Sequence, residues 1–263
     1  MSIATEITRI QQAKADIKTA IEAKGVTVPS SATIDTYDDY VSQISGGGGG
    51  GDIPMPSNLS SATFNDYGRI TSAAIKSGVT SIGQEAFAGC TSLTSVTLSN
   101  TVTSFSYQSF YASGIVTFSI LDSVTDIGTN AFQNCGSLTS CTIGSGITSI
   151  TNNTFAGCSS LKTIDIPNGI TSIGGSAFQL CTSLTSVTIG SGVTSIGQQA
   201  FNGCRKLTSI TIYAATPPTL ENANAFNNTN NCPIYVPSES VDTYKAANIW
   251  STHASRIQAI PNS

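Results

Sequence analysis

Charged side chains are scarce in this sequence. Of its 263 residues, 10% are charged, with 11 Lys and Arg against 15 Asp and Glu and a formal net charge of −4, whereas roughly 25% is usual in globular proteins. A protein that binds nucleic acid needs a cluster of Lys and Arg, and here the basic residues are scattered and outnumbered. We therefore expect no nucleic-acid partner.

Long apolar runs are also missing. No run approaches the ~18 apolar residues that suggest a membrane-spanning helix, so we expect no membrane insertion. The first residues, MSIATEITRIQQAK, lack the apolar segment of a secretory signal. We therefore expect a chain that folds in a reducing cytoplasm and is released without secretion.

Residues typical of catalytic sites are few. The chain has one histidine, His253, so a Ser/His/Asp or Cys/His site has one possible base. Four carboxylates lie at unrelated points of the sequence and are interpreted as solvated surface; they are Glu85, Asp122, Asp126 and Asp165. We expect a non-enzymatic protein with no catalytic residue, metal or cofactor.

Hydroxyl side chains replace the missing charges, because Ser and Thr, at 38 and 35 residues, make up more than a quarter of the chain. The chain also carries a strong internal repeat. Phenylalanine recurs at spacings of 23, 22, 23, 23 and 23 residues, followed by a decayed seventh copy; the residues are Phe87, Phe110, Phe132, Phe155, Phe178, Phe201 and Phe226. Because one copy cannot bury its apolar side chains alone, the copies must stack. This predicts an α+β repeat fold, a solenoid of about six 23-residue coils plus a degenerate one.

Each copy contains two strand patterns. Leu-Thr-Ser-Val-Thr-Ile has the alternation of a half-buried strand, and Val-Thr-Ser-Ile predicts a second, shorter strand. Glycines such as Gly128 and Gly174 are expected to form corners by adopting φ > 0. The second copy is one residue short between Phe110 and Ile115, and it has Ser113 where the others have cysteine.

The repeat Ile-Gly-x-x-Ala-Phe-x-Gly-Cys-x-Ser-Leu-Thr-x-Val-Thr-Ile resembles the BspA-like (Treponema pallidum type) leucine-rich repeat over residues 79 to 212. This resemblance implies a leucine-rich-repeat solenoid. Residues 234–260 are similar to the C-terminal cap of such proteins, and their pattern also predicts a strand followed by a short helix. Open solenoid ends need such a cover.

The first 45 residues have a different pattern. Isoleucines near the N-terminus follow the a/d spacing of a coiled-coil seam; they are Ile3, Ile7, Ile10, Ile17 and Ile21. Ile at both positions favours three or four strands, so a homo-trimer is expected, although packing on a second helix as an αα-hairpin is an equal alternative. Six glycines, residues 46–51, follow as a flexible linker.

The expected domains are therefore a helical anchoring module at 1–45, a Gly linker at 46–52, the solenoid at 53–232 and a C-terminal cap at 233–263. The module resembles N-terminal segments of structural proteins of phages that infect gut Bacteroidales, with the Ile-Thr-Arg-Ile-x-x-Ala-Lys pattern, across residues 5–44. That resemblance implies attachment to a virion.

Seven cysteines occur in the chain, and five share one coil position; these are Cys90, Cys135, Cys158, Cys181 and Cys204. Stacking places neighbours about 4.8 Å apart, which a disulfide would allow. The odd total and the absence of C-x-x-C spacing favour buried free thiols over disulfides or zinc.

Threonines recur on both strand patterns. A flat row of hydroxyls can bind a glycan or ice, although Thr also suits any exposed strand face. Candidate ligand contacts are Thr97, Thr142 and Thr188, with Tyr107 and Tyr111 of the irregular coil as stacking platforms or as core residues.

The first hypothesis is a non-enzymatic phage virion structural protein, made in the host cytoplasm. Its module would attach to capsid or tail through other virion proteins, and its solenoid would project as a fibre or decoration that binds host surface glycan or protein. The alternative is a bacterial cell-surface adhesin, as the repeat resemblance implies. A third is an intracellular scaffold.

Overall fold

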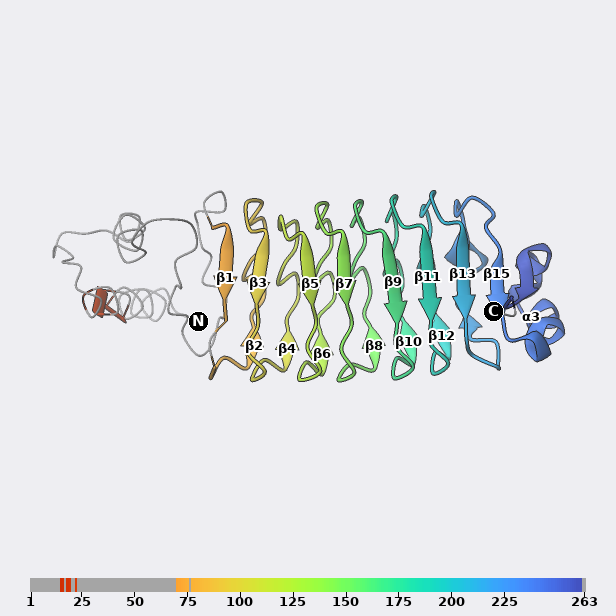
Figure 1. Cartoon of the computed structure of the whole chain (residues 1–263), viewed down its shortest axis with the longest axis horizontal. Coiled ribbons are helices and arrows are strands. Elements are labelled where there is room, and N and C mark those ends of the chain that lie inside the picture. The colour runs from red at the N-terminus through yellow and green to blue at the C-terminus, as the bar shows by residue number, and fades with distance from the viewer. Residues whose placement is uncertain (1–14, 17, 20–21, 23–69, 76, 262–263) are drawn as a thin grey trace, which may run out of the picture.

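The computed structural model describes residues 15–16, 18–19, 22, 70–75 and 77–261. From residue 70 the chain winds into a solenoid whose parallel strands stand side by side along one axis (Figure 1). In the described chain seven successive coils each contribute a longer strand and a two-residue strand; the longer strands form three sheets and the shorter strands form two. The expected solenoid of stacked coils is confirmed.

The longer strands are β1 (Ser72–Ala74), β3 (Ser95–Thr97), β5 (Thr117–Ser119), β7 (Ser140–Thr142), β9 (Thr163–Ile166), β11 (Ser186–Ile189), β13 (Ser209–Ile212), β15 (Ile234–Val236) and β16 (Ile257–Ala259). The shorter strands are β2 (Ser81–Ile82), β4 (Ser104–Phe105), β6 (Asp126–Ile127), β8 (Ser149–Ile150), β10 (Ser172–Ile173), β12 (Ser195–Ile196) and β14 (Thr219–Leu220). Pairing follows the repeat, since Ile173 of β10 is in register with Ile150 and Ile196.

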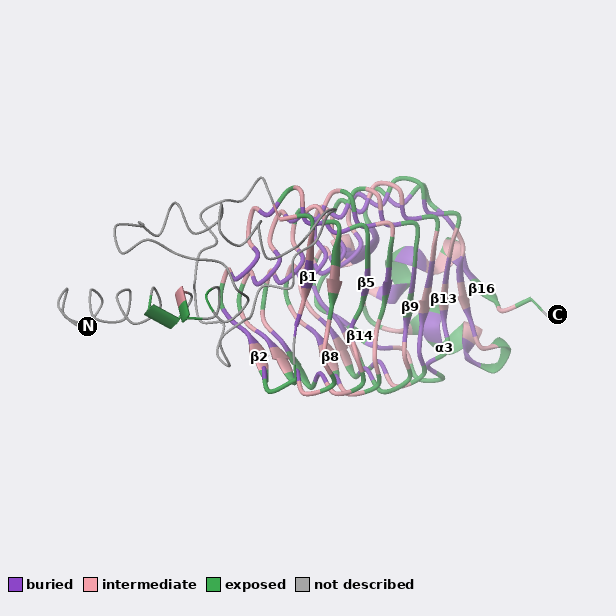
Figure 2. Ribbon diagram, turned by 60° about the vertical axis from the view of Figure 1, so that its left-hand side comes forward, coloured by how far each residue is buried: buried purple, intermediate pink, exposed green. Residues whose placement is uncertain are grey.

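The phenylalanines form one buried column through the solenoid. Phe132 and Phe155 have ring centroids 5.4 Å apart, and Phe155 and Phe178 are 5.3 Å apart, with nearly parallel planes. The column continues from Phe87 to Phe226. Figure 2 shows that buried stretches recur along the coils. Identical side chains therefore pack on their own counterparts, as the repeat predicts.

The expectation that the recurring glycines form corners with positive φ is wrong for Gly128 and Gly174, which are not among the residues with positive φ. From Phe87 to Phe201, each coil instead turns through two left-handed residues, placed two positions before and two after its Phe, such as Asn153 (φ 55°) and Gly157 (φ 74°). The glycines are needed for close packing of successive coils: a Cβ on Gly128 would lie 2.5 Å from the backbone of Tyr107.

The irregular second coil loses its residue in the turn after Ser113. In the first coil Thr91 N–H bonds the carbonyl of Gly89 (2.7 Å), whereas Gly114 N–H reaches back to Cys90 of the preceding coil (3.0 Å). A Cβ on Gly114 would lie 2.0 Å from the Thr91 carbonyl oxygen. A glycine is therefore required where the shortened coil presses on its neighbour.

Many threonine hydroxyls link successive coils. The hydroxyl of Thr171 donates to the carbonyl of Thr148 (3.1 Å), and that of Thr194 donates to the carbonyl of Thr171 (3.0 Å). Residues that enter the longer strands do the same, as in the bond from Thr208 to Thr185 (2.9 Å). Much of the Thr content therefore satisfies backbone carbonyls between coils.

The C-terminal segment covers the last coil. It contains the 3-10 helices η2 (Ala223–Phe226), η3 (Ser238–Ser240) and η4 (Trp250–Arg256), the helix α3 (Val241–Ala246) and strands β15 and β16. Trp250 contacts Phe226 at the end of the ring column, with centroids 5.6 Å apart, and its Nε1 donates to the Pro218 carbonyl (2.6 Å). Tyr244 packs edge-on against Trp250 and donates to the Ala214 carbonyl (2.8 Å).

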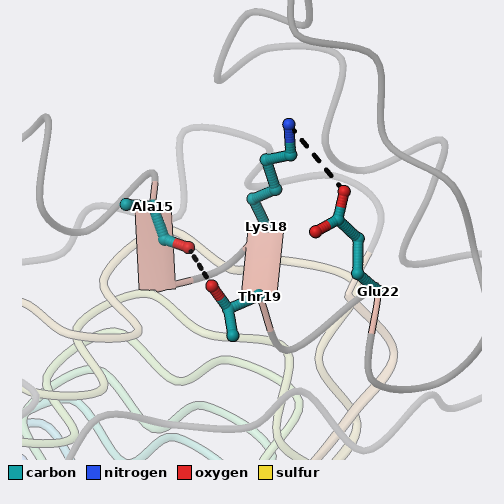
Figure 3. A network of polar contacts seen from close by, with 4 residues as sticks. All are labelled: Ala15, Lys18, Thr19 and Glu22. Atoms are coloured by element: carbon teal, nitrogen blue, oxygen red, sulfur yellow. Dashed lines mark hydrogen bonds and ion pairs between the residues drawn. The ribbon is translucent and has the colours of Figure 1, made fainter.

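The described residues of the N-terminal segment are helical. Thr19 Oγ1 donates to the Ala15 carbonyl (2.9 Å), and Lys18 and Glu22 form an i,i+4 ion pair at 3.8 Å (Figure 3). The predicted seam residues Ile3, Ile7, Ile10, Ile17 and Ile21, and the linker at 46–52, lie outside the described residues. No helix in the described part of the chain is long and apolar enough to cross a membrane.

Candidate binding surface

The outer side of the longer strands carries a row of polar side chains, because side chains alternate between the two faces of a strand. Thr188 of β11 is in register with Asp165 of β9 and Thr211 of β13, and Thr142 of β7 is in register with Ser119 of β5. We call this set, which has hydroxyl side chains at all positions except Asp165, the hydroxyl row: Thr97, Ser119, Thr142, Asp165, Thr188 and Thr211. Thr97 and Thr142 are exposed and Thr188 is half-buried.

The two predicted tyrosines lie elsewhere in the coil. Tyr107 and Tyr111 are in the turn segment between β4 and β5, on either side of the buried Phe110. Tyr107 is 42% exposed, and Tyr111 is half-buried with its hydroxyl accepting a bond from Asn134 Nδ2 (3.2 Å). Neither is a core residue, and the structure does not bring them to the hydroxyl row.

Two other tyrosines extend the row towards the C-terminal end. Tyr235 of β15 is in register with Thr211, and Tyr213 directly follows β13 and is 49% exposed. Sequence reasoning missed both. The alternation of side chains along a strand could have identified Tyr213, because it stands two residues after Thr211 and so points to the same face of the strand. An aromatic pair therefore adjoins the hydroxyl row.

The cysteine column is part of the core. The Sγ atoms of Cys158 and Cys181 each donate to the carbonyl of the Phe one coil earlier, at 3.2 Å. All seven cysteines are free and buried, which confirms that prediction. Burial raises the pKa of Cys90 to about 11 and that of Cys135 to about 11, where hydrogen bonds with Ser113 oppose the shift. A thiol with a raised pKa carries little thiolate and is a poor nucleophile.

The predicted carboxylates do not converge. Asp126 lies in β6 and Asp165 in β9, while Glu85 lies in a turn. Asp122 Oδ1 accepts hydrogen bonds from the Ser145 backbone N–H (2.7 Å) and hydroxyl (2.9 Å) of the next coil, and these bonds lower its pKa. Asp122 therefore links coils. Among the described residues no group of three or more His, Cys, Asp or Glu could hold a metal ion.

His253 lies in η4 and is 7% exposed. Its ring meets Phe226 edge-on, with centroids 5.6 Å apart, and its Nε2 has no hydrogen-bond partner in the described structure. Burial lowers its pKa, and the nearby Arg256 adds to that effect against a hydrogen bond with the Ala223 backbone. The ring is therefore mostly neutral near pH 7.

Comparison with family profiles matches residues 57–185 and 125–251 to a family described as BspA type leucine rich repeat region (6 copies). Together these ranges cover well over half of the chain. No curated protein matches the chain.

Several solved structures are similar to this chain. A leucine rich cell surface protein from Faecalibacterium prausnitzii is 24% identical, with a TM-score of 0.35, over 73% of this chain and 64% of that chain. A leucine rich repeat protein from T. pallidum is 21% identical, with a TM-score of 0.45, over 74% and 88% of the two chains. One from Bacteroides ovatus is 18% identical, with a TM-score of 0.30, over 73% and 84%. The chain thus spans less than two thirds of the F. prausnitzii protein.

Proposed function

Because the chain belongs to the BspA-type leucine-rich repeat family, we propose that it is a non-enzymatic binding protein whose longer strands present an extended recognition face. The single observation that carries this proposal is the hydroxyl row with Tyr213 and Tyr235 at one end. The partner is a surface glycan or a surface protein of a host cell.

The row suits recognition for two physical reasons. Within each sheet neighbouring positions lie about 4.8 Å apart, and the rings and strands stacked beneath hold that spacing fixed. A fixed array loses little conformational entropy when it binds a long ligand. Tyrosine rings supply contact area that hydroxyls lack, so the aromatic end is the expected point of firmest contact.

Large side chains introduced into the hydroxyl row test whether this face binds the ligand. Replacing Thr142 and Thr188 together with Arg should reduce binding to a printed array of host and bacterial surface glycans by tenfold or more. Thr148→Arg is the matched control, since Thr148 is exposed just before β8 on the other ladder, and it should bind as the parent does. An equal loss of binding in the double variant and the control, or no loss in either, would contradict the assignment of this face.

For display, we propose that the N-terminal module assembles as a trimer and docks on other virion proteins, so that the solenoid projects from a phage capsid or tail. This placement is supported by the isoleucine spacing of residues 3–21 and the resemblance of residues 5–44. Display on a bacterial cell surface is the alternative. The family match supports a binding role in either setting.

Light scattering on the full chain separates these possibilities. The virion proposal expects three times the 27.0 kDa chain mass, and a monomer after replacing Ile7 and Ile10 with Asp, because carboxylates in an a/d seam disrupt association. Gln11→Asp, outside the seam, should remain trimeric. A monomeric parent chain would contradict attachment through a trimer. Recovery of the protein from cell envelopes without phage particles would support display on a bacterial cell surface.

A further inference from the structure

A groove of about 550 Å³ lies at the C-terminal end, between the segment that follows Phe226 and the segment formed by η4 and β16. Its volume falls in the ~300–1,000 Å³ range of small-molecule sites. The polar side chains that line it include Asn227, Asn228, Asn231, Thr252, Ser255 and Gln258. Arg256 and His253 also line it.

Arg256 gives the groove a single positive charge. Its Nε donates to the Cys232 carbonyl (2.8 Å), and its Nη2 donates to Thr229 Oγ1 (2.9 Å) and Cys232 Sγ (3.5 Å). Its Nη1 donates one bond, to the Phe226 carbonyl (3.4 Å), so one of the five guanidinium N–H groups is left over. These partners are neutral, and no carboxylate among the described residues lies within ion-pair distance.

The remaining lining groups are neutral. His253 is uncharged, and its Nε2 is buried, without a partner in the described chain, and does not open onto the groove. The three asparagines offer both donors and acceptors. Asn228 and Asn231 adopt left-handed φ of 55° and 48°, a conformation that costs energy outside glycine.

The repeat does not require this arrangement. The preceding coils place their Phe residues 23 or 22 residues apart, whereas Phe201 and Phe226 are 25 apart. The asparagines follow Phe226 in the stretch that leads to β15, and η4 brings Arg256 into the same groove. The groove therefore lies where the last coil meets the C-terminal segment.

We propose that this groove binds an acidic sugar, with its carboxylate against Arg256 and its hydroxyls against the asparagine amides and the Thr252 and Ser255 hydroxyls. One unneutralised cation among neutral amides and hydroxyls complements one carboxylate on a polyhydroxylated ring. A doubly charged phosphate would find one cation, most of whose donors are already used. The site is separate from the hydroxyl row, so its failure would leave the proposed function intact.

Titration calorimetry with two probes that differ by one group tests the proposal. The full chain should bind methyl β-D-glucuronide at least fivefold more tightly than methyl β-D-glucoside. Gln258→Glu and Asn231→Asp each add a carboxylate to the groove at nearly constant side-chain shape. Each variant should bind the acidic sugar at least fivefold more weakly than the parent, with an unchanged thermal midpoint of unfolding.

Asn168→Asp is the matched control. Asn168 lies outside the groove and its Oδ1 accepts a bond from Ser191 N–H (2.9 Å), as Asp122 does from Ser145, so a carboxylate fits there. This variant should bind the acidic sugar as the parent does. Equal affinity for the acidic and neutral sugars, or unchanged affinity in Gln258→Glu, would overturn the proposal.

Discussion

Ser109 stands in a buried column that is otherwise mostly alanine, directly before each Phe; the other members are Ala86, Ala131, Thr154, Ala177, Ala200 and Ala225. The Thr154 hydroxyl donates to the Thr151 carbonyl (2.7 Å). The Ser109 hydroxyl is fully buried and has no partner among the described residues. A buried hydroxyl without a bond opposes folding by ~1–3 kcal/mol.

Ser109→Ala is therefore expected to raise the free energy of unfolding, by about 1 kcal/mol, because the alanine removes the unsatisfied hydroxyl and leaves little space. Urea unfolding followed by circular dichroism would measure it. Thr154→Val is the control with the opposite sign, since it removes a satisfied bond and should cost about 0.5–1.5 kcal/mol. A destabilised Ser109→Ala variant would show that the hydroxyl has a partner.

Asp122 gives the protein an acid-sensitive link between coils. Its pKa is lowered by the backbone and hydroxyl bonds from Ser145, so the folded state favours the carboxylate. A lowered folded-state pKa stabilises the fold above the unfolded-state pKa of about 3.9, and the contribution is lost as the pH falls through the folded-state pKa.

Asp122→Asn should therefore make stability less sensitive to acid in the interval below about pH 4, while the Ser145 bonds persist as they do at Asn168. Urea midpoints measured across that interval for the parent and the variant test this. Parallel pH profiles would contradict the assignment.

At the scale of the turn element, some glycines pack tightly against the backbone of the neighbouring coil and others have space for a side chain. A Cβ on Gly174 would lie 2.7 Å from the Asn152 backbone nitrogen, whereas a Cβ on the adjacent Gly175 would meet nothing closer than 3.6 Å. Neither is among the glycines with positive φ. The two neighbours therefore differ in the closeness of the preceding coil.

Gly174→Ala is expected to destabilise the protein by about 1–3 kcal/mol, because backbone must move to admit the methyl group. Gly175→Ala should be neutral or stabilising by about 0.4–1 kcal/mol, because alanine restricts the unfolded chain. Thermal unfolding of the two variants compares them directly. Equal effects would mean that backbone freedom, and not coil spacing, selects glycine.

At the scale of the whole molecule, each coil contacts mainly its two neighbours, so stability is close to a sum of coil and interface contributions. The register of Ile150, Ile173 and Ile196 means that one coil can be removed without changing what its neighbours meet. Removing residues 151–173 joins Ile150 to Gly174, which reproduces the natural Ile173–Gly174 junction.

That deletion should give a shorter folded solenoid with a circular dichroism spectrum of the same shape and a modestly lower thermal midpoint. Removing residues 151–161, about half a coil, should prevent cooperative unfolding because the rings and strands fall out of register. A folded protein after the half-coil deletion would show that the coils are not the units of stability.

The sequence by itself determined the coil length, both strand patterns, the Phe column and the buried free cysteines, because in a stacked repeat each local pattern meets its own copy and no long-range pairing must be guessed. It also located the shortened coil. The tertiary structure alone decided why the glycines are there, because close approach of coils is not a local property. It also placed Tyr107 and Tyr111 apart from the hydroxyl row, and it brought Arg256 into one groove with asparagines 25 to 29 residues earlier in the chain. That groove lies where the repeat ends, so no periodicity in the sequence could predict it.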